Sequence, residues 1–107
     1  MSTINYQVLK ELGQHYGTPL YVYDGSLVRR QVQRLQDAFQ EVDMHIKYAC
    51  KANTNLALLR LMRNLGVEVD VVSMGEMQMA LLAGYQPSQI TFTPSGVPFE
   101  EVREAVD

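Results

Sequence analysis

The sequence contains one cysteine, two histidines and no tryptophan, and it has no excess of basic residues. A single cysteine, Cys50, excludes an internal disulfide and a cysteine-rich zinc site. His15 and His45 lie too far apart in the chain to suggest a metal site. The net charge of −3 lacks the basic footprint of a nucleic-acid-binding domain. No apolar run approaches the roughly 20 residues of a membrane-spanning helix, and no secretion signal is present. These absences predict a cytoplasmic protein with no metal, nucleic-acid or membrane partner.

Hydrophobic residues make up 47% of the sequence, a share that is typical of a folded globular chain. Apolar residues at helical spacing predict a helix over residues 4–16 and a second helix that begins after a cap at Asp24–Ser26. The buried face of the second helix is expected to consist of Val28, Val32, Leu35, Phe39 and Val42. Between the two helices, the aromatic and β-branched residues 20–23 predict a short strand.

From Met44 onward, predicted strands and helices alternate. Strands are expected at 44–52, 67–73 and 89–94. Helices are expected at 56–65, ended by Gly66, at 74–83, ended by Gly84, and from about Pro98. Ala49 and Asp70 are 21 residues apart, and so are Asp70 and Thr91. This period indicates right-handed βαβ units in a parallel sheet, either doubly wound or the start of a (β/α)₈ barrel. Because the last helix has just begun at residue 107, the chain is expected to be part of a longer protein.

Lys51 stands at the carboxyl end of the first predicted strand of this sheet, where ligands and catalytic groups collect in α/β folds. Strand alternation puts it on one face with Ala49, whose small side chain leaves space, and with Asp70 one unit later. In general, a lysine deprived of water has a lowered pKa and becomes a nucleophile toward carbonyl groups. A lysine that extends into water is the other interpretation, and position alone favours it.

Two acidic residues follow at the same end of the predicted sheet. Asp70 fits either a partner for a cationic centre or a member of a structural ion pair, and both interpretations stay open. Ser73 and Glu76 have the S-x-x-E spacing of a capping box, which by itself accounts for both residues. The same box also fixes the Glu76 carboxylate at the top of the sheet. Cys50 is expected to face the helices as an inert core residue.

Four stretches, YGTPLYVYD, YACKANTN, DVVSMGE and ALLAGYQPSQITF, occur in the order found in fold-type III pyridoxal-phosphate decarboxylases. The sequence resembles that family from about Tyr16 to Val106, and within it the diaminopimelate decarboxylases most. The resemblance implies an α/β fold, the N-terminal part of a (β/α)₈ TIM barrel that is incomplete over residues 1–107. It also implies that residues 19–24 form a strand of a C-terminal β-domain outside this chain.

The resemblance further implies a function. Lys51 would be the catalytic lysine that forms a Schiff base with pyridoxal 5′-phosphate, and Ala49, Asp70 and Glu76 would lie close to that cofactor. The reaction would be that of a carbon–carbon lyase, the decarboxylation of the amino acid meso-diaminopimelate to L-lysine, in a homodimer. The family's phosphate-binding loop, ring-nitrogen partner and catalytic cysteine are expected beyond residue 107, so the 107-residue chain alone is expected to be inactive.

Two stretches depart from the family's pattern and leave the substrate open. Met74-Gly75-Glu76 stands in place of Gly-Gly-Glu, and TPSGVP at 93–98 replaces a polar or lysine-bearing loop. An ornithine- or arginine-type decarboxylase shares the lysine and the acidic motifs and is the first alternative. Another is a non-catalytic homologue that binds a partner, although such a protein would not need Lys51. The last is an unrelated α/β domain with an incidental lysine.

Overall fold

The structure is a computed structural model that describes residues 4–107. The chain divides into two compact units, one up to Asp43 and one from Met44 to Asp107. None of the described helices is long and apolar enough to cross a membrane.

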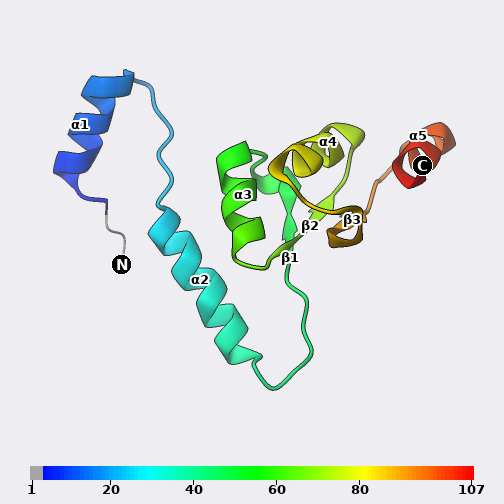
Figure 1. Ribbon diagram of the computed structural model, residues 1–107. Helices are drawn as coiled ribbons and strands as arrows, with labels where there is room; N and C mark the ends of the chain where they lie inside the picture. Colours follow the sequence, from blue (N-terminus) through cyan, green and yellow to red (C-terminus); the bar gives the residue numbers. More distant parts are fainter. Residues whose placement is uncertain (1–3) are drawn as a thin grey trace. The chain divides into compact units, whose positions relative to one another are not determined.

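The first unit contains two helices, α1 (Tyr6–Tyr16) and α2 (Gly25–Ala38) (Figure 1). The Asn5 side chain caps α1 by accepting a backbone hydrogen bond of 3.0 Å, and Gly17 ends that helix with a positive φ of 84°. The Asp24 carboxylate caps α2 by accepting two backbone N–H groups at 2.9 and 3.2 Å. Both helices and the cap at residue 24 confirm the predictions.

The segment Leu20–Tyr23 forms no strand within the described chain. A strand needs a neighbour to receive its backbone hydrogen bonds, and the described part of the first unit contains only helices and loops. The prediction of a strand is therefore wrong for this chain taken alone. That residues 19–24 join a β-domain outside it stays a prediction.

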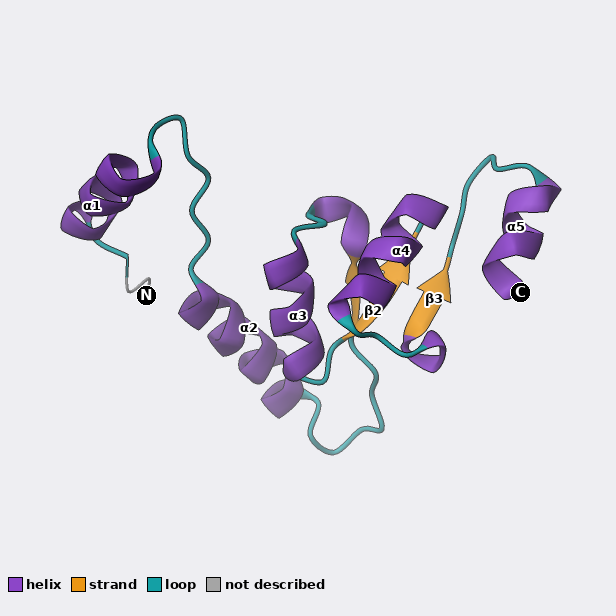
Figure 2. Ribbon diagram, turned by 45° about the horizontal axis from the view of Figure 1, so that its top comes forward, coloured by secondary structure: helices purple, strands orange, loops and turns teal. Residues whose placement is uncertain are grey.

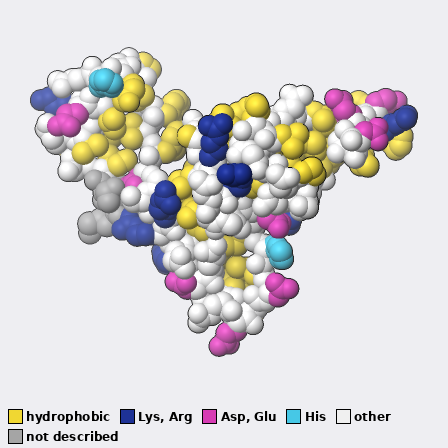
Figure 3. Space-filling view, viewed as in Figure 1, with side chains coloured by type: hydrophobic (Ala, Val, Ile, Leu, Met, Phe, Trp, Pro, Cys, Tyr) yellow, Lys and Arg dark blue, Asp and Glu magenta, His cyan; other side chains and the backbone are white. Residues whose placement is uncertain are grey.

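The apolar face of α2 is less buried than its sequence predicts. Val32 is buried, but Leu35, Phe39 and Val42 are 42%, 45% and 61% exposed. The helix ends at Ala38, so the last two of these residues lie outside it. No strand occurs among residues 4–43, so no sheet within that unit covers this face. Apolar side chains also gather on the surface over α1 (Figure 3).

The second unit is built on three parallel strands in the order β1-β2-β3. They are β1 (Lys47–Ala49), β2 (Glu68–Val71) and β3 (Ile90–Phe92). Helix α3 (Leu56–Asn64) joins the first two strands, and α4 (Met74–Ala83) with the short 3-10 turn η2 (Pro87–Gln89) joins the second and third. Helix α5 (Phe99–Val106) follows β3 and has Glu100 and Glu101 in its first turn. This alternation is the α/β arrangement that the sequence predicts.

The register of the sheet matches the period in the sequence. Ala49 pairs with Asp70, and Asp70 pairs with Thr91. Each βα unit therefore advances the chain by one strand in 21 residues, which confirms the predicted spacing. Because paired residues of parallel strands point to the same side, these three side chains share one face of the sheet.

Helices α3 and α4 pack against the other face of the sheet (Figure 2). Val69 and Val71, which flank Asp70 in β2, are fully buried under these helices. The buried cluster consists of Cys50, Leu59, Val69, Val71, Ala80, Ala83 and Tyr85. The Tyr85 hydroxyl donates to the backbone oxygen of Val67 at 3.0 Å, so its polar atom is satisfied inside the core.

Two glycines end the helices of this unit, as predicted. Gly66 follows α3 with a φ of 76°, and Gly84 caps α4 in the left-handed region with a φ of 95°. Residues with a side chain rarely adopt this conformation. The glycines let the chain reverse toward β2 and β3 and so keep the strands parallel.

Candidate functional site

Lys51 lies on a 3-10 turn, η1 (Cys50–Ala52), that follows β1 directly. The predicted strand over residues 44–52 is therefore too long, because β1 ends at Ala49. Strand alternation does not extend to Lys51, so the prediction that it shares a strand face with Ala49 is wrong. The turn nevertheless places Lys51 at the carboxyl end of the sheet, as the sequence predicts.

Hydrogen bonds around Asn53 explain why the chain turns at this point. The Asn53 N–H donates to the Cys50 backbone oxygen at 3.1 Å, and the Tyr48 hydroxyl donates to the Asn53 backbone oxygen at 2.9 Å. The Asn53 side chain accepts the Asn55 N–H at 2.9 Å. The Asn55 side chain then caps α3 by accepting two N–H groups at 3.0 and 3.3 Å. The motif YACKANTN thus specifies the end of a strand, the turn with the lysine, and the start of a helix.

The Lys51 side chain is exposed and makes no hydrogen bond or ion pair with any residue in 4–107. Its amine is therefore available to a ligand. The preceding residue, Cys50, is fully buried, and burial raises its thiol pKa to about 11, with a smaller contribution from the charge of Glu76. The prediction that Cys50 is a core residue is confirmed.

Asp70 lies in β2 on the same face as Ala49, as the sequence predicts. Asp70 is half-buried, and its Oδ1 accepts a hydrogen bond at 2.5 Å from the hydroxyl of Thr93, which is exposed. None of the ion pairs among the described residues includes Asp70, so the interpretation as a structural ion pair finds no support in residues 4–107. Thr93 was not among the predicted site residues. It lies two residues after Thr91, the register partner of Asp70, so strand alternation could have placed it on the same face as Asp70.

Glu76 and Ser73 form the predicted cap of α4, with one difference. The Ser73 hydroxyl accepts the Glu76 N–H at 3.2 Å, while Glu76 Oε2 accepts the N–H of Val72 at 2.7 Å. In the usual capping box the glutamate binds the N–H of the capping residue itself. Here Glu76 instead binds the N–H of Val72, the residue between β2 and the capping residue. Its second oxygen, Oε1, accepts no hydrogen bond from the described part of the chain.

A cluster of charged residues occupies the amino end of the sheet, opposite Lys51. Glu68 contacts His45 Nδ1 through Oε1 at 2.9 Å and Lys47 Nζ through Oε2 at 2.5 Å. The hydrogen bond from Lys47, followed by that from His45, lowers the pKa of Glu68 below its usual value of 4.5. This cluster was not predicted, although Lys47 and Glu68 are paired in the same 21-residue register. The carboxylate of Glu68 thus offsets the charge of Lys47 at the end of the sheet opposite Lys51.

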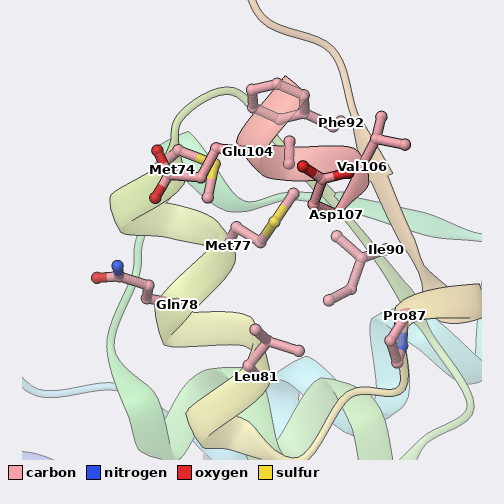
Figure 4. A pocket seen from close by; sticks show the side chains of 11 residues that line it. Met74, Met77, Gln78, Leu81, Pro87, Ile90, Phe92, Glu104, Val106 and Asp107 are labelled. Carbon is pink, nitrogen blue, oxygen red and sulfur yellow. The ribbon is translucent and has the colours of Figure 1, made fainter. Parts of the chain in front are cut away.

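An apolar pocket of about 320 Å³ lies between α4, β3 and α5 (Figure 4). Met77 and Leu81 of α4 and Ile90 of β3 line it, and none of the predicted site residues does. Ile90 and Phe92 pair with Val69 and Val71, so the pocket is on the helical face of the sheet. Asp70 lies on the opposite face. The pocket is therefore separate from the polar end of the sheet.

The carboxyl end of the sheet thus carries a lysine amine that is unpaired within residues 4–107, the small residue Ala49 and two carboxylates. Each carboxylate has one oxygen, Asp70 Oδ2 and Glu76 Oε1, that accepts no hydrogen bond from residues 4–107. An accessible amine is suited to covalent attachment of an aldehyde. No group of three histidine, cysteine or acidic side chains within the described residues has a metal-binding arrangement.

Comparison with known proteins gives one consistent result. The pyridoxal-binding domain of the pyridoxal-dependent decarboxylases matches residues 25–107. Diaminopimelate decarboxylase of Methanothermobacter thermautotrophicus is 43% identical over 99 residues, which are 91% of this chain and 23% of that protein. The crystal structure of diaminopimelate decarboxylase from Helicobacter pylori complexed with L-lysine has a TM-score of 0.83 at 38% identity, over 92% of this chain and 25% of that chain.

A more distant relative shares the same architecture. The crystal structure of ornithine decarboxylase from Entamoeba histolytica has a TM-score of 0.78 at 25% identity, over 92% of this chain and 31% of that chain. The chain therefore spans about a quarter of the length of the diaminopimelate decarboxylases that it matches. These structures confirm the predicted fold class, the N-terminal part of a barrel.

Proposed function

Because the chain belongs to the pyridoxal-dependent decarboxylases, we propose that the protein containing it decarboxylates meso-diaminopimelate to L-lysine. The observation that carries the proposal is the exposed amine of Lys51, on the turn after β1, which has no ion-pair partner in the described part of the chain. This turn lies in the motif that is most specific for the family. The diaminopimelate decarboxylases among the relatives, at up to 43% identity, support the choice of substrate.

The residues at this end of the sheet fit the cofactor. Lys51 would hold pyridoxal 5′-phosphate covalently through its side-chain nitrogen, because no residue in 4–107 competes for that amine. Ala49 leaves room for a flat ring on the face that it shares with Asp70. When bound, the cofactor supplies an electron sink for breaking the bond between Cα and the carboxylate.

The two carboxylates would act on the electrostatics of the site. Asp70 is held by Thr93 and keeps Oδ2 directed away from that bond, available to a cationic group of the cofactor or the substrate. Glu76 is fixed by the Val72 N–H at the start of α4 and places a second negative charge at the end of β2. Both carboxylates are oriented by the protein before any ligand binds, which reduces the entropy lost on binding.

Reduction with borohydride tests the attachment point. The full-length protein is incubated with pyridoxal phosphate, reduced, digested and mapped by mass spectrometry. We expect the label on Lys51 and its loss in Lys51→Ala. The matched control is Lys47→Arg, a change on the preceding strand that keeps a cation beside Glu68 and should leave the label in place. A label at any lysine other than Lys51 would refute the assignment.

A substrate comparison tests the activity. The full-length protein is assayed for carbon dioxide release from meso-diaminopimelate, ornithine and arginine. Release from the first substrate alone supports the proposal, and release only from ornithine or arginine would assign the protein to that branch. If the full-length protein takes up no cofactor, as judged by its absorbance, the non-catalytic homologue replaces the enzyme.

The proposal includes a cytoplasmic homodimer of the full-length protein. The family resemblance supports this assembly, in which subunits share the active sites. Sedimentation analysis of the full-length protein measures its mass directly, and a monomer that retains full activity would contradict it.

A further inference from the structure

We propose that Thr93 is a positioning residue of this site. Its hydroxyl holds the Asp70 carboxylate in one orientation and leaves Oδ2 free to face the cofactor. The inference rests on the proposed function and adds to it a residue from the third βα unit.

The local sequence explains why Thr93 reaches Asp70. The Thr93 N–H donates to the Val71 backbone oxygen at 2.9 Å, so parallel pairing continues one residue beyond β3. Pro94 follows, and a residue before proline is restricted to extended backbone. Alternation from Thr91, the register partner of Asp70, then brings the Thr93 side chain back to the same face.

The contact itself is suited to orienting a carboxylate. The Thr93 hydroxyl donates to Asp70 Oδ1 at 2.5 Å. A hydrogen bond to an ionised group is roughly twice as strong as one between neutral groups. Threonine is branched at Cβ and has few side-chain rotamers, and the Thr93 backbone is held by its hydrogen bond to Val71, so the hydroxyl has few alternative positions. No ion pair among residues 4–107 includes Asp70, and Thr93 is the side chain that fixes its direction.

The test measures cofactor affinity in a double-mutant cycle. The dissociation constant of pyridoxal phosphate is determined by absorbance titration of the full-length apoprotein as wild type, Thr93→Val, Asp70→Ala and the double variant. Thr93→Val keeps the shape of the side chain and removes the hydroxyl. We expect roughly tenfold weaker binding in the single variant, and no more than about a twofold effect of the same change when Asp70 is already alanine.

Two further variants separate positioning from folding. Thr93→Ser keeps the hydroxyl and should restore affinity to within about threefold of wild type. Thr91→Val removes a hydroxyl from the same strand and face that makes no hydrogen bond to Asp70, and its effect should be independent of Asp70. If Asp70→Ala does not fold, Asp70→Val, which suits a strand and also lacks an acceptor for the Thr93 hydroxyl, takes its place in the cycle.

The outcomes distinguish this inference from the proposed function. If the wild type binds the cofactor and Thr93→Val binds it equally well, Thr93 has no positioning role but the proposed function stands. Thr93 likewise has no positioning role if its effect persists unchanged without Asp70. If the wild type binds no cofactor, both proposals fail.

Discussion

Replacing Gly84 with alanine should destabilise the carboxyl end of α4 for two reasons, a strained backbone and a steric clash. Gly84 has a φ of 95°, and a residue with a Cβ pays about 1–2 kcal/mol in the left-handed region. Its new Cβ would also lie 2.7 Å from Arg63 Nη1, closer than such atoms approach. Arg63 Nη1 also donates a hydrogen bond to the Gly84 backbone oxygen at 3.0 Å. Because the new Cβ displaces the Arg63 side chain, this hydrogen bond is lost.

The two costs can be separated. The lost hydrogen bond is worth about 1 kcal/mol, because Arg63 is exposed and water replaces part of it. The strain and the lost hydrogen bond together should lower the free energy of opening at this helix end by about 2–3 kcal/mol in Gly84→Ala. In an Arg63→Ala background the clash and the bond are both absent. There the same glycine change should cost only the backbone strain of about 1–2 kcal/mol.

Native-state hydrogen exchange of the full-length protein measures these free energies at the Tyr85 amide, which donates to the Ala80 oxygen at 3.1 Å across the helix end. The matched control is Gly75→Ala in the same helix. There the nearest atom to a new Cβ is 3.8 Å away, and the change should leave protection equal or raise it by up to about 1 kcal/mol. Equal protection in Gly84→Ala and wild type would refute the argument from backbone and contact.

Two further predictions concern the turn that holds Lys51 and the opposite end of the sheet. Asn55→Ala removes the cap of α3 and should destabilise that helix by about 1 kcal/mol, measured by exchange at the Leu59 amide, whereas Asn55→Asp keeps the capping oxygen and should cost little. Glu68→Gln should lower the free energy of unfolding by on the order of 0.5 kcal/mol at pH 7, since Lys47 is 39% exposed and water screens the pair. Because the pKa of Glu68 is lowered in the folded state, this difference is present above its usual value of 4.5 and should vanish as the pH falls through the lower folded value. Urea unfolding at several pH values checks it, and a difference that grows on acidification would contradict the sign.

The parts of the second unit that the sequence predicted well depend on local chemistry. A glycine that follows a helical apolar pattern commonly ends the helix, because glycine adopts a positive φ without strain. Gly66 and Gly84 both do so here. The spacing of Ala49, Asp70 and Thr91 fixed the register, since a parallel sheet with helical connections repeats at nearly constant length. These signals are short-range or periodic, and no tertiary contact has to be known to use them.

The features that were not predicted depend on specific side-chain contacts between residues that are distant in sequence or in different elements. The bond from Thr93 to Asp70 joins two residues 23 positions apart, and it requires knowing that pairing continues beyond β3. The turn at Lys51 depends on the Tyr48 hydroxyl, which has to reach forward to Asn53. For α2, periodicity identified an apolar face but gave no information on what covers it. Hydrophobic periodicity shows which side of an element is apolar, but it does not show which residue binds a given polar group or which element covers an apolar face.

The burial of Cys50 has a consequence for the selectivity of the turn toward electrophiles. Burial raises the pKa of the Cys50 thiol to about 11, so the reactive thiolate is a minor form near neutral pH. Its sulfur is also fully enclosed by the core, while the amine of the next residue is open to water. Of the two adjacent nucleophiles at the end of β1, the Cys50 thiol and the Lys51 amine, an aldehyde can therefore reach only the amine. If Lys51 binds the cofactor as proposed, enclosing the neighbouring sulfur leaves nitrogen as the one accessible nucleophile at this turn.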